Sequence, residues 1–355
     1  MAADLASMNV AELQAWVESQ GLRTFHARQI FRWLHQRGAA SYEEMTDLSK
    51  DLRARLPQLA PLLRPVIVEE RPCSDGAVKY RFRLHDGLEV EGVFIPESDR
   101  QTVCISSQVG CGMGCAFCAT GTMGFLRNLS AAEIAGQVEA IMARLRAPDG
   151  RRPVSNVVFM GMGEPLANLP AVIRAAEILL DPLGPGFSRR HITVSTAGLI
   201  PAMEEFVRRS PVKLAVSLNA TSDEVRDRIM PVNRRFPLER LLAACRNLPF
   251  QHGDRVTFEY VMLGGINDSD EDARRLLRLL SGIRAKVNLI PFNPFPGSAF
   301  ARPSRERVDA FLERLAGGGV SAFVRQSRGA SQGGACGQLV TTARGRAAPD
   351  SKAGG

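Results

Sequence analysis

Hydrophobic residues recur with a helical period near the start of the chain. In residues 26–38 they stand three or four positions apart, as on the buried face of a helix. The apolar positions are Ala27, Ile30, Phe31 and Leu34, and the polar positions assigned to the other side are Arg28, Arg32 and His35. A second helix is predicted over residues 49–56. Residues 1–64 are therefore expected to form a small helical unit, whose basic face is either solvated or in contact with a nucleic acid.

The next part of the chain alternates between apolar and polar residues. The alternation is clear in VKYRFRLHDGLEVEGVFIP, residues 78–96. Asp86 and Gly87 interrupt it with a pair that favours a tight hairpin turn. A short antiparallel sheet is therefore predicted within residues 65–98.

Residues 101–328 combine short apolar runs with helical stretches. Ser130 and Glu133, and likewise Ser269 and Asp272, have the spacing of a capping box at a helix start. Such alternation predicts βαβ units in a parallel sheet, either an open or partial β/α barrel or a doubly wound sheet, and periodicity does not separate the two. In both, ligands bind at the carboxyl ends of the strands. The predicted strands are TVCISSQ, VSNVVFMGM, HITVST, VKLAVSLN, RVTFEYVML, KVNLIPFN and SAFVRQ.

Composition narrows the classes of protein that need consideration. The 355 residues include 45% hydrophobic and 23% charged residues, as in ordinary globular proteins. No apolar run reaches the roughly 20 residues that cross a bilayer, and no secretory signal is expected from the acidic N-terminus. The net charge of +8 is compatible with a polyanionic partner without establishing one. Seven cysteines without an export signal favour a metal site or reactive thiols over disulfides.

Three cysteines lie close together after the first predicted barrel strand. Cys111, Cys115 and Cys118 form C-x3-C-x2-C in the segment VGCGMGCAFCATG. Three thiolates can bind three irons of a 4Fe–4S cluster and leave the fourth iron open. A structural zinc site, the alternative, uses four ligands and usually pairs two C-x2-C units, and no second unit is present. The spacing therefore favours an iron–sulfur cluster, with zinc or unrelated packing cysteines as alternatives.

This loop, with Phe117 before its last cysteine, resembles the radical S-adenosylmethionine (SAM) superfamily. Further segments are similar to the RlmN/Cfr family within it, whose members methylate an unactivated carbon of adenine in RNA. The similarity extends from about residue 10 to about residue 340. The similar segments are CISSQVGCGMGCAFCATGTMGFLRNL, FMGMGEPLAN, SLNATSDEVRD, PFNPFPG, ACGQL and the N-terminal GLRTFHARQIFRWLHQRG and EMTDLSK.

The resemblance implies a domain arrangement. Residues 1–64 would be an N-terminal helical RNA-binding domain, and residues 65–100 a β-hairpin extension. Residues 101–328 would form a partial (β/α)6 radical SAM barrel. Residues 329–342 would be the loop of a methyl-carrier cysteine. The composition of residues 343–355, which are small and polar, predicts a disordered tail.

The resemblance also implies a mechanism with one 4Fe–4S cluster and two SAM molecules per turnover. One SAM would methylate Cys336, and the second would give a 5′-deoxyadenosyl radical that activates this methyl group for addition to adenine. Glu91 would accept the ring proton, and Cys104 would release the product by a transient disulfide with Cys336. The cluster ligands would be Cys111, Cys115 and Cys118. The residues implied in SAM binding are Gly163, Glu164, Ser195, Ser217, Leu218, Asn219 and Asn293.

Two positions depart from the family pattern. Position 219 is commonly His in relatives and is Asn here. Acidic and aliphatic residues usually precede ACGQL, whereas this chain has Ala330, Ser331, Gln332 and Gly333. This second change alters the loop expected to hold Cys336 and with it the docking of the substrate.

The resemblance implies an enzyme that acts on carbon 2 of adenine in 23S rRNA and in tRNA. It would be a cytoplasmic monomer without membrane contact, reduced by an electron donor such as flavodoxin. Three alternatives remain open on the sequence. They are methylation of carbon 8, a radical SAM reaction on a protein or metabolite, and a non-catalytic RNA-binding protein with a structural metal.

Overall fold

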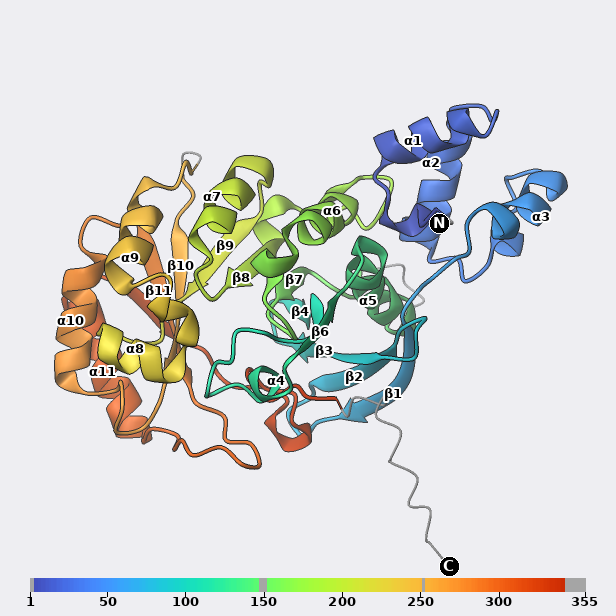
Figure 1. Ribbon diagram of the computed structural model, residues 1–355. Helices are drawn as coiled ribbons and strands as arrows, with labels where there is room; N and C mark the ends of the chain where they lie inside the picture. Colours follow the sequence, from blue (N-terminus) through green and yellow to red (C-terminus); the bar gives the residue numbers. More distant parts are fainter. Residues whose placement is uncertain (1–2, 147–151, 251–252, 342–355) are drawn as a thin grey trace, which may run out of the picture.

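The computed structural model describes residues 3–146, 152–250 and 253–341 (Figure 1). Its N-terminal part is helical, as predicted. It contains α1 (Val10–Ser19), α2 (Phe25–Arg32), a π-helical turn (Trp33–Arg37) and α3 (Lys50–Leu59). The predicted apolar stripe of α2 is buried throughout. The second helix is longer than predicted because Pro57 is accommodated within it.

One residue of the π-helical turn that follows α2 was assigned to the wrong side of the predicted helix. Arg28 and Arg32 are exposed, but His35 is only 3% exposed. His35 follows Phe31 by four positions, and the centroids of the two rings are 4.5 Å apart. Residues four apart lie on the same side of a helix, so His35 belongs to the edge of the apolar stripe, where the barrel covers it.

The predicted antiparallel strands extend the main sheet rather than forming a separate one. They are β1 (Val66–Pro72), β2 (Val78–Arg83) and β3 (Glu89–Pro96). Asp86 and Gly87 form the turn between β2 and β3, and Gly87 has a positive φ of 82°. β3 pairs antiparallel with the first barrel strand, with Val93 opposite Cys104.

All seven predicted barrel strands are present and parallel. They are β4 (Gln101–Cys104), β7 (Asn156–Phe159), β8 (Ile192–Thr196), β9 (Lys213–Ser217), β10 (Val256–Met262), β11 (Ala285–Pro291) and β12 (Ser321–Val324). Their spatial order follows their order in the sequence. A doubly wound sheet reverses its strand order at a switch point. The partial β/α barrel is therefore confirmed.

Helices follow the strands around the outside of the curved sheet (Figure 1). They are α5 (Ala131–Arg144), α6 (Leu169–Leu180), α7 (Ile200–Arg209), α8 (Asp223–Ile229), α9 (Leu238–Asn247), α10 (Asp270–Leu280) and α11 (Arg305–Gly317). Both predicted capping boxes are formed, at the starts of α5 and α10. A small two-stranded sheet, β5 (Gln108–Gly110) with β6 (Phe125–Asn128), and the short α4 (Ala119–Thr122) interrupt this pattern after β4.

The helical unit lies against α5 and α6 through polar contacts. The buried carboxylate of Glu139 on α5 accepts a hydrogen bond from His35 Nδ1 at 2.7 Å and another from Arg64 Nη1 at 3.0 Å. Ser7 Oγ accepts the N–H of Ala132 at the start of α5, at 2.9 Å. These bonds fix the helical unit on the outer surface of the barrel.

The last described segment, residues 325–341, returns from β12 to the β1–β3 extension. Asp75, in the turn between β1 and β2, accepts the N–H of Gly329 at 2.7 Å, and Ser331 Oγ accepts the N–H of Ser74 at 3.3 Å. The altered loop before Cys336 is thus anchored on this turn. The predicted tail over 343–355 lies outside the described residues. None of the helices that the structure describes is long and apolar enough to cross a membrane.

Candidate active site

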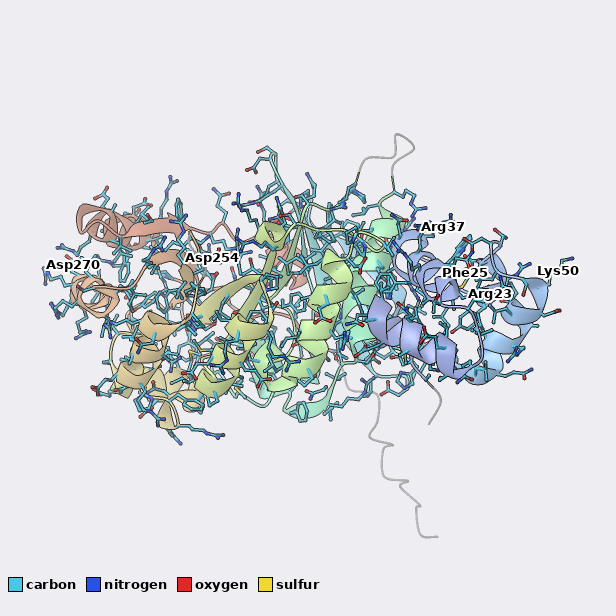
Figure 2. All side chains as sticks on the ribbon, turned by 90° about the horizontal axis from the view of Figure 1, so that it is seen from above. Arg23, Phe25, Arg37, Lys50, Asp254 and Asp270 are labelled. Carbon is cyan, nitrogen blue, oxygen red and sulfur yellow. The ribbon has the colours of Figure 1, made fainter. Side chains whose placement is uncertain are left out.

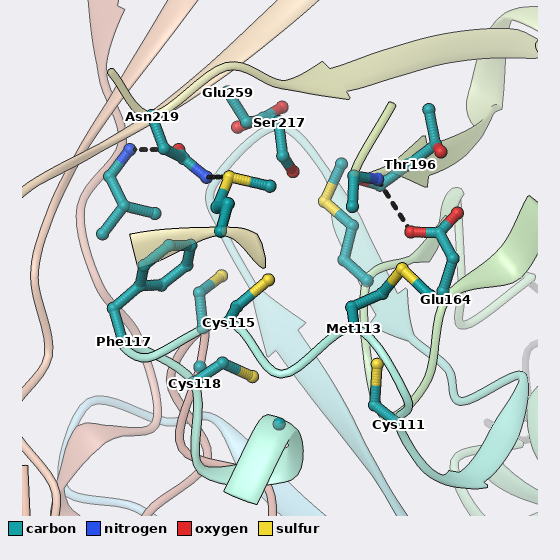
Figure 3. A pocket seen from close by; sticks show the side chains of 18 of the residues that line it. Cys111, Met113, Cys115, Phe117, Cys118, Glu164, Thr196, Ser217, Asn219 and Glu259 are labelled. Carbon is teal, nitrogen blue, oxygen red and sulfur yellow. Dashed lines mark hydrogen bonds between the residues drawn. The ribbon is translucent and has the colours of Figure 1, made fainter. Parts of the chain in front are cut away.

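The three clustered cysteines lie in the loop between β5 and α4. The N–H of Cys111 donates to the carbonyl of Gly124 at 2.8 Å, which closes the start of the loop. The N–H of Cys118 donates to the carbonyl of Cys115 at 3.1 Å, and Cys118 precedes the first turn of α4. All three side chains face one cavity, with Cys111 apart from the other two (Figure 3). We call this space the cluster cavity.

The arrangement of these thiols fits an iron–sulfur cluster better than a single metal ion. In the described part of the chain, no three side chains among His, Cys, Asp and Glu stand close enough to share one ion. A 4Fe–4S cluster has no such requirement, because each thiolate binds a different iron. Burial raises the pKa of the Cys111 thiol to about 11 and also raises the pKa values of Cys115 and Cys118. These cysteines would therefore exchange protons for iron when they bind a cluster.

Most residues that the resemblance assigns to SAM line the same cavity. They are Gly163, Glu164, Ser195, Ser217, Asn219 and Asn293. They come from the carboxyl ends of successive barrel strands, where β/α folds bind ligands. The sequence thus brings cluster ligands and polar ligand-binding groups into one space from segments far apart in the chain.

Gly163 and Glu164 shape one wall of this cavity. Gly163 has a φ of +100°, and a Cβ there would lie 2.5 Å from Gln108 Cβ, so only glycine fits. Glu164 is buried, and its two carboxylate oxygens accept the N–H groups of Leu166 at 3.0 Å and Ala197 at 2.7 Å. Burial raises the pKa of Glu164, and the bond from Ala197 acts in the opposite direction. Glu164 is therefore fixed in place before any ligand binds.

The side chains of Leu218 and Asn219 differ from those of the other residues assigned to SAM, because both are engaged in packing or hydrogen bonds within the protein. The Leu218 side chain is fully buried in the main core and does not line the cavity. Asn219 has a φ of 57°, a conformation that Asn tolerates. Its side-chain oxygen accepts the N–H of Val261 at 2.8 Å, and its nitrogen contacts Met230 Sδ at 3.2 Å. The backbone is held as well: the carbonyl of Asn219 accepts Asn267 Nδ2 at 2.7 Å, and the N–H of Leu218 donates to the carbonyl of Glu259 at 3.0 Å. The turn is therefore fixed by the protein itself.

Cys336 faces the cluster cavity because its loop is tied to the cysteine loop. The N–H of Ala119 donates to the carbonyl of Gly337 at 2.7 Å, and Thr120 Oγ1 donates to the carbonyl of Leu339 at 2.6 Å. Asn293 Nδ2 donates to the carbonyl of Cys336 itself at 3.3 Å. The departure from the family pattern before Cys336 therefore leaves its thiol at the site.

A second cavity adjoins the cluster cavity and lies in the interior of the barrel. We call it the lumen cavity; Cys104 and Cys336 both line it, as do inward-facing residues of β7 to β12. Burial and the neighbouring Cys336 raise the pKa of the Cys104 thiol to about 12, while Arg325 acts in the opposite direction. The basic residues that line the cavity are Arg100, Arg190, Lys213, Lys286, Arg325 and Arg328, and the acidic ones are Glu97 and Glu259. The excess of positive charge suits an anionic ligand.

Glu91 lies outside both cavities but beside the loop of Cys336. It is 4% exposed, so a solvent-facing strand carboxylate is excluded. Its Oε1 is 2.9 Å from Lys79 Nζ, and its Oε2 accepts the N–H of Val340 at 3.0 Å. The carboxylate is thus bonded to Val340, which follows Cys336 by four positions in the same loop.

Sequence reasoning missed two buried charged residues at the site. Arg226 on α8 is fully buried and donates to the carbonyls of Ala197 and Leu218 at 2.9 Å and of Ser217 at 3.0 Å. Burial lowers the pKa of Arg226 to about 10. Arg226 joins the ends of β8 and β9, but an arginine in an amphipathic helix carries no sequence signal for this task. The second residue is Glu259, in the middle of β10.

Comparison with known proteins identifies the class. Residues 105–277 match the radical SAM superfamily, and residues 3–62 match the ribosomal RNA large subunit methyltransferase N-terminal domain. The crystal structure of a radical SAM methyltransferase from Sphaerobacter thermophilus has a TM-score of 0.90 and 46% identity, over 95% of this chain and 98% of that chain. The fold and the cysteine loop thus define a radical SAM enzyme, a class that uses a 4Fe–4S cluster and SAM.

Curated relatives narrow the class further. A dual-specificity RNA methyltransferase RlmN from Anaeromyxobacter dehalogenans is 52% identical over 340 residues, which cover 95% of this chain and 91% of the relative. Another RlmN, from Geobacter sulfurreducens, is 52% identical over 338 residues, with the same coverage of both chains. The chain belongs to the RlmN family of radical SAM RNA methyltransferases. The family and the enzyme class predicted from the sequence motifs are confirmed.

Proposed function

We propose that this enzyme methylates carbon 2 of adenine in 23S rRNA and in tRNA by way of a methylated cysteine. The observation that carries the proposal is the position of Cys336. Its thiol borders both the cluster cavity and the lumen cavity, and Cys104 borders the lumen cavity beside it. The dual specificity in the names of the relatives supports two kinds of RNA substrate.

Carbon 2 of adenine lies between two ring nitrogens and is electron-poor, so it does not attack the methyl group of SAM directly. When bound, the cluster and SAM supply a 5′-deoxyadenosyl radical, and Cys111, Cys115 and Cys118 would hold the cluster. Gly163, Glu164, Ser195, Ser217, Asn219 and Asn293 would enclose SAM at the strand ends, and Leu218 would support this wall from the core. These residues exclude water from the reacting groups and orient them.

The chain itself would supply a carrier, a base and a resolving thiol. Cys336 accepts a methyl group on sulfur and presents it to the base, which enters from the lumen cavity. Glu91 accepts the proton of the methylated ring carbon. One hydrogen of the methyl group on Cys336 is lost to the radical before its carbon bonds to the ring. The Cys104 thiolate then attacks the sulfur of Cys336: a disulfide forms, the carbon–sulfur bond breaks, and its electron pair stays on the product carbon, which takes up a proton to become the methyl group. An external thiol or protein reductant restores both thiols, which fits a reducing cytoplasm.

The target adenine must leave its stack to reach this site. Unpaired or loop RNA is therefore the natural substrate, and the helical unit would bind its phosphates. Arg23, Arg37 and Lys50 are exposed on this unit (Figure 2), as are Arg28 and Arg32. We further propose that the enzyme acts as a cytoplasmic monomer and receives electrons from a donor such as flavodoxin.

Mass spectrometry of adenosines from treated RNA tests the proposal. Anaerobically reconstituted enzyme, with SAM and a reductant, is expected to produce 2-methyladenosine in 23S rRNA fragments and in tRNA. The Cys336→Ala variant should keep about four irons per chain and form no product. Cys245→Ala is the matched control, because Cys245 is buried in α9 outside both cavities. Product from Cys336→Ala, or 8-methyladenosine from the wild-type enzyme, would contradict the proposal.

A further inference from the structure

Glu259 occupies the boundary between the two cavities. It lies in the middle of β10, is 4% exposed and lines both the cluster cavity and the lumen cavity. In the strand register it is paired with Ser217 of β9 and Asn288 of β11. Figure 3 shows its carboxylate beside Ser217, opposite the cysteine loop. Met160, Ile290 and Cys336 also line both cavities, so a ligand at this junction lies among these three residues and Glu259.

Only half of this carboxyl group has a partner. Asn288 Nδ2 donates to Oε1 at 2.8 Å. Oε2 is buried, and no group in the described parts of the chain forms a hydrogen bond with it. An unpaired buried oxygen costs free energy, so a native structure rarely retains one without a reason.

Glu164, in the same cavity, has a carboxylate whose hydrogen bonds are complete within the protein. Both of its oxygens accept backbone N–H groups. The Glu259 carboxylate, by contrast, binds no backbone group in the described parts of the chain, and its one hydrogen bond there comes from a side chain on the neighbouring strand. Its free oxygen is thus available to a ligand, as expected of a binding residue.

Charges around Glu259 leave it able to act as donor or acceptor. Burial raises the pKa of Glu259, while Arg325, the bond from Asn288 and Lys286 act in the opposite direction. A carboxyl group in this balance can accept a hydrogen bond when ionised and donate one when protonated. Adenosine offers ribose hydroxyls, an exocyclic amino group and ring nitrogens, which match both possibilities.

We propose that Oε2 of Glu259 forms a hydrogen bond with an adenosine group held at the junction of the two cavities. The proposal rests on the proposed function, which brings two adenosines to this place. One is the adenosine of SAM and the other is the target nucleoside of the RNA. Either source uses the same chemistry, and the experiment separates them.

The test compares Glu259→Met, which removes the polar oxygens at similar volume, with Glu259→Gln, which keeps an amide in their place. Glu271→Gln is the control, since it makes the same change on an exposed residue of α10. Equilibrium dialysis measures SAM binding to reconstituted enzyme without RNA. RNA-free SAM cleavage and methyl transfer to RNA are measured on the same samples, together with the melting temperature.

For Glu259→Met we expect a loss of about tenfold, the effect of one hydrogen bond to a charged group. If the partner is SAM, its dissociation constant rises and RNA-free cleavage falls. If the partner is the target nucleoside, both stay at the wild-type level while the KM for RNA rises. In each case Glu259→Gln recovers part of the loss, and the melting temperature of Glu259→Met equals or exceeds that of the wild type, because a buried polar group has been removed.

Two results would overturn the proposal. One is SAM binding, cleavage and methyl transfer by Glu259→Met at the level of Glu271→Gln. The other is a lowered melting temperature that accounts for the loss, with no recovery of function in Glu259→Gln at normal stability. A wild-type enzyme that binds SAM but methylates no RNA would instead refute the proposed function. The measurements of SAM binding and cleavage would then still test whether Glu259 binds the adenosine of SAM.

Discussion

The buried carboxylate of Glu139 connects the N-terminal helical unit to the barrel, so its replacement by Gln should loosen that connection. Burial alone would raise the pKa of Glu139, but the interactions with His35 and Arg64 outweigh it and hold this pKa below its ordinary value. The ionised form is therefore the one that stabilises the junction. Glu139→Gln keeps the size of the side chain and removes the charge that both partners face.

The expected cost follows from the surroundings of the two partners. Breaking a buried ion pair costs about 3–5 kcal/mol when the remaining charge stays buried. Here the Arg64 side chain is 16% exposed and can turn toward water. We therefore expect a loss at the lower end of this range, about 3 kcal/mol.

Tryptophan fluorescence offers a local assay. Both tryptophans of the chain, Trp16 and Trp33, lie in the helical unit, so their emission in urea reports on this unit. Far-ultraviolet circular dichroism follows the whole protein in parallel. Glu177→Gln is the control, because Glu177 binds Asn9 at the same junction but its side chain is 43% exposed. This control should change the unfolding free energy by less than about 0.5 kcal/mol.

The pH dependence gives the result that would refute the reasoning. A carboxylate with a lowered pKa in the folded state contributes stability above its unfolded pKa, near 4.5, and loses it as the pH falls through the folded value. The difference between wild type and Glu139→Gln should thus be complete at neutral pH and shrink below about pH 4.5. Equal stabilities at pH 7, or a difference that persists unchanged in acid, would show that the charge of Glu139 does not hold the junction.

Three further predictions concern RNA binding, product release and the strand ends. Changing Arg28 and Arg32 together to Glu should weaken RNA binding and flatten its salt dependence in filter-binding assays, while RNA-free SAM cleavage persists; an unchanged affinity would make this face merely solvated. Cys104→Ala should accumulate protein joined covalently to RNA, visible on denaturing gels, because the resolving thiol is missing; free methylated RNA at the normal rate would argue against this role. Arg226→Met should lose about 3 kcal/mol in chemical unfolding, because it leaves buried carbonyls without donors; a variant as stable as the wild type would contradict this.

Local sequence patterns predicted the helices and strands well, but they predicted less well how these elements pack against one another. The seven barrel strands and both capping boxes could be read from sequence, because period and caps are local properties. Strand order could not, because a barrel and a doubly wound sheet share the same alternation; the family resemblance made that choice. His35 was predicted to be exposed because its polar side chain lies at the edge of the apolar stripe, where the sequence does not show whether a neighbouring helix buries it.

The candidate site shows the same division. The cysteine loop was recognisable because its ligands are adjacent in sequence, whereas Glu259 and Arg226 gave no signal because their burial depends on strands distant in the chain. Among the residues assigned from the resemblance, Leu218 points into the core although its motif matches. A motif fixes the path of the backbone, but the direction of each side chain depends on the packing around it.

The bonds between the cysteine loop and the loop of Cys336 also set an order of events during synthesis. Thr120 and Leu339, which bond to each other, are 219 positions apart. At 5–20 residues per second, the ribosome needs roughly 10–40 s to make the segment between them. Throughout that period the cysteine loop lacks the segment around Cys336 that later bonds to it. A nascent chain therefore offers iron-delivery proteins this loop alone, whereas in the finished protein a cluster must enter a cavity that Cys336 and Gly337 also line.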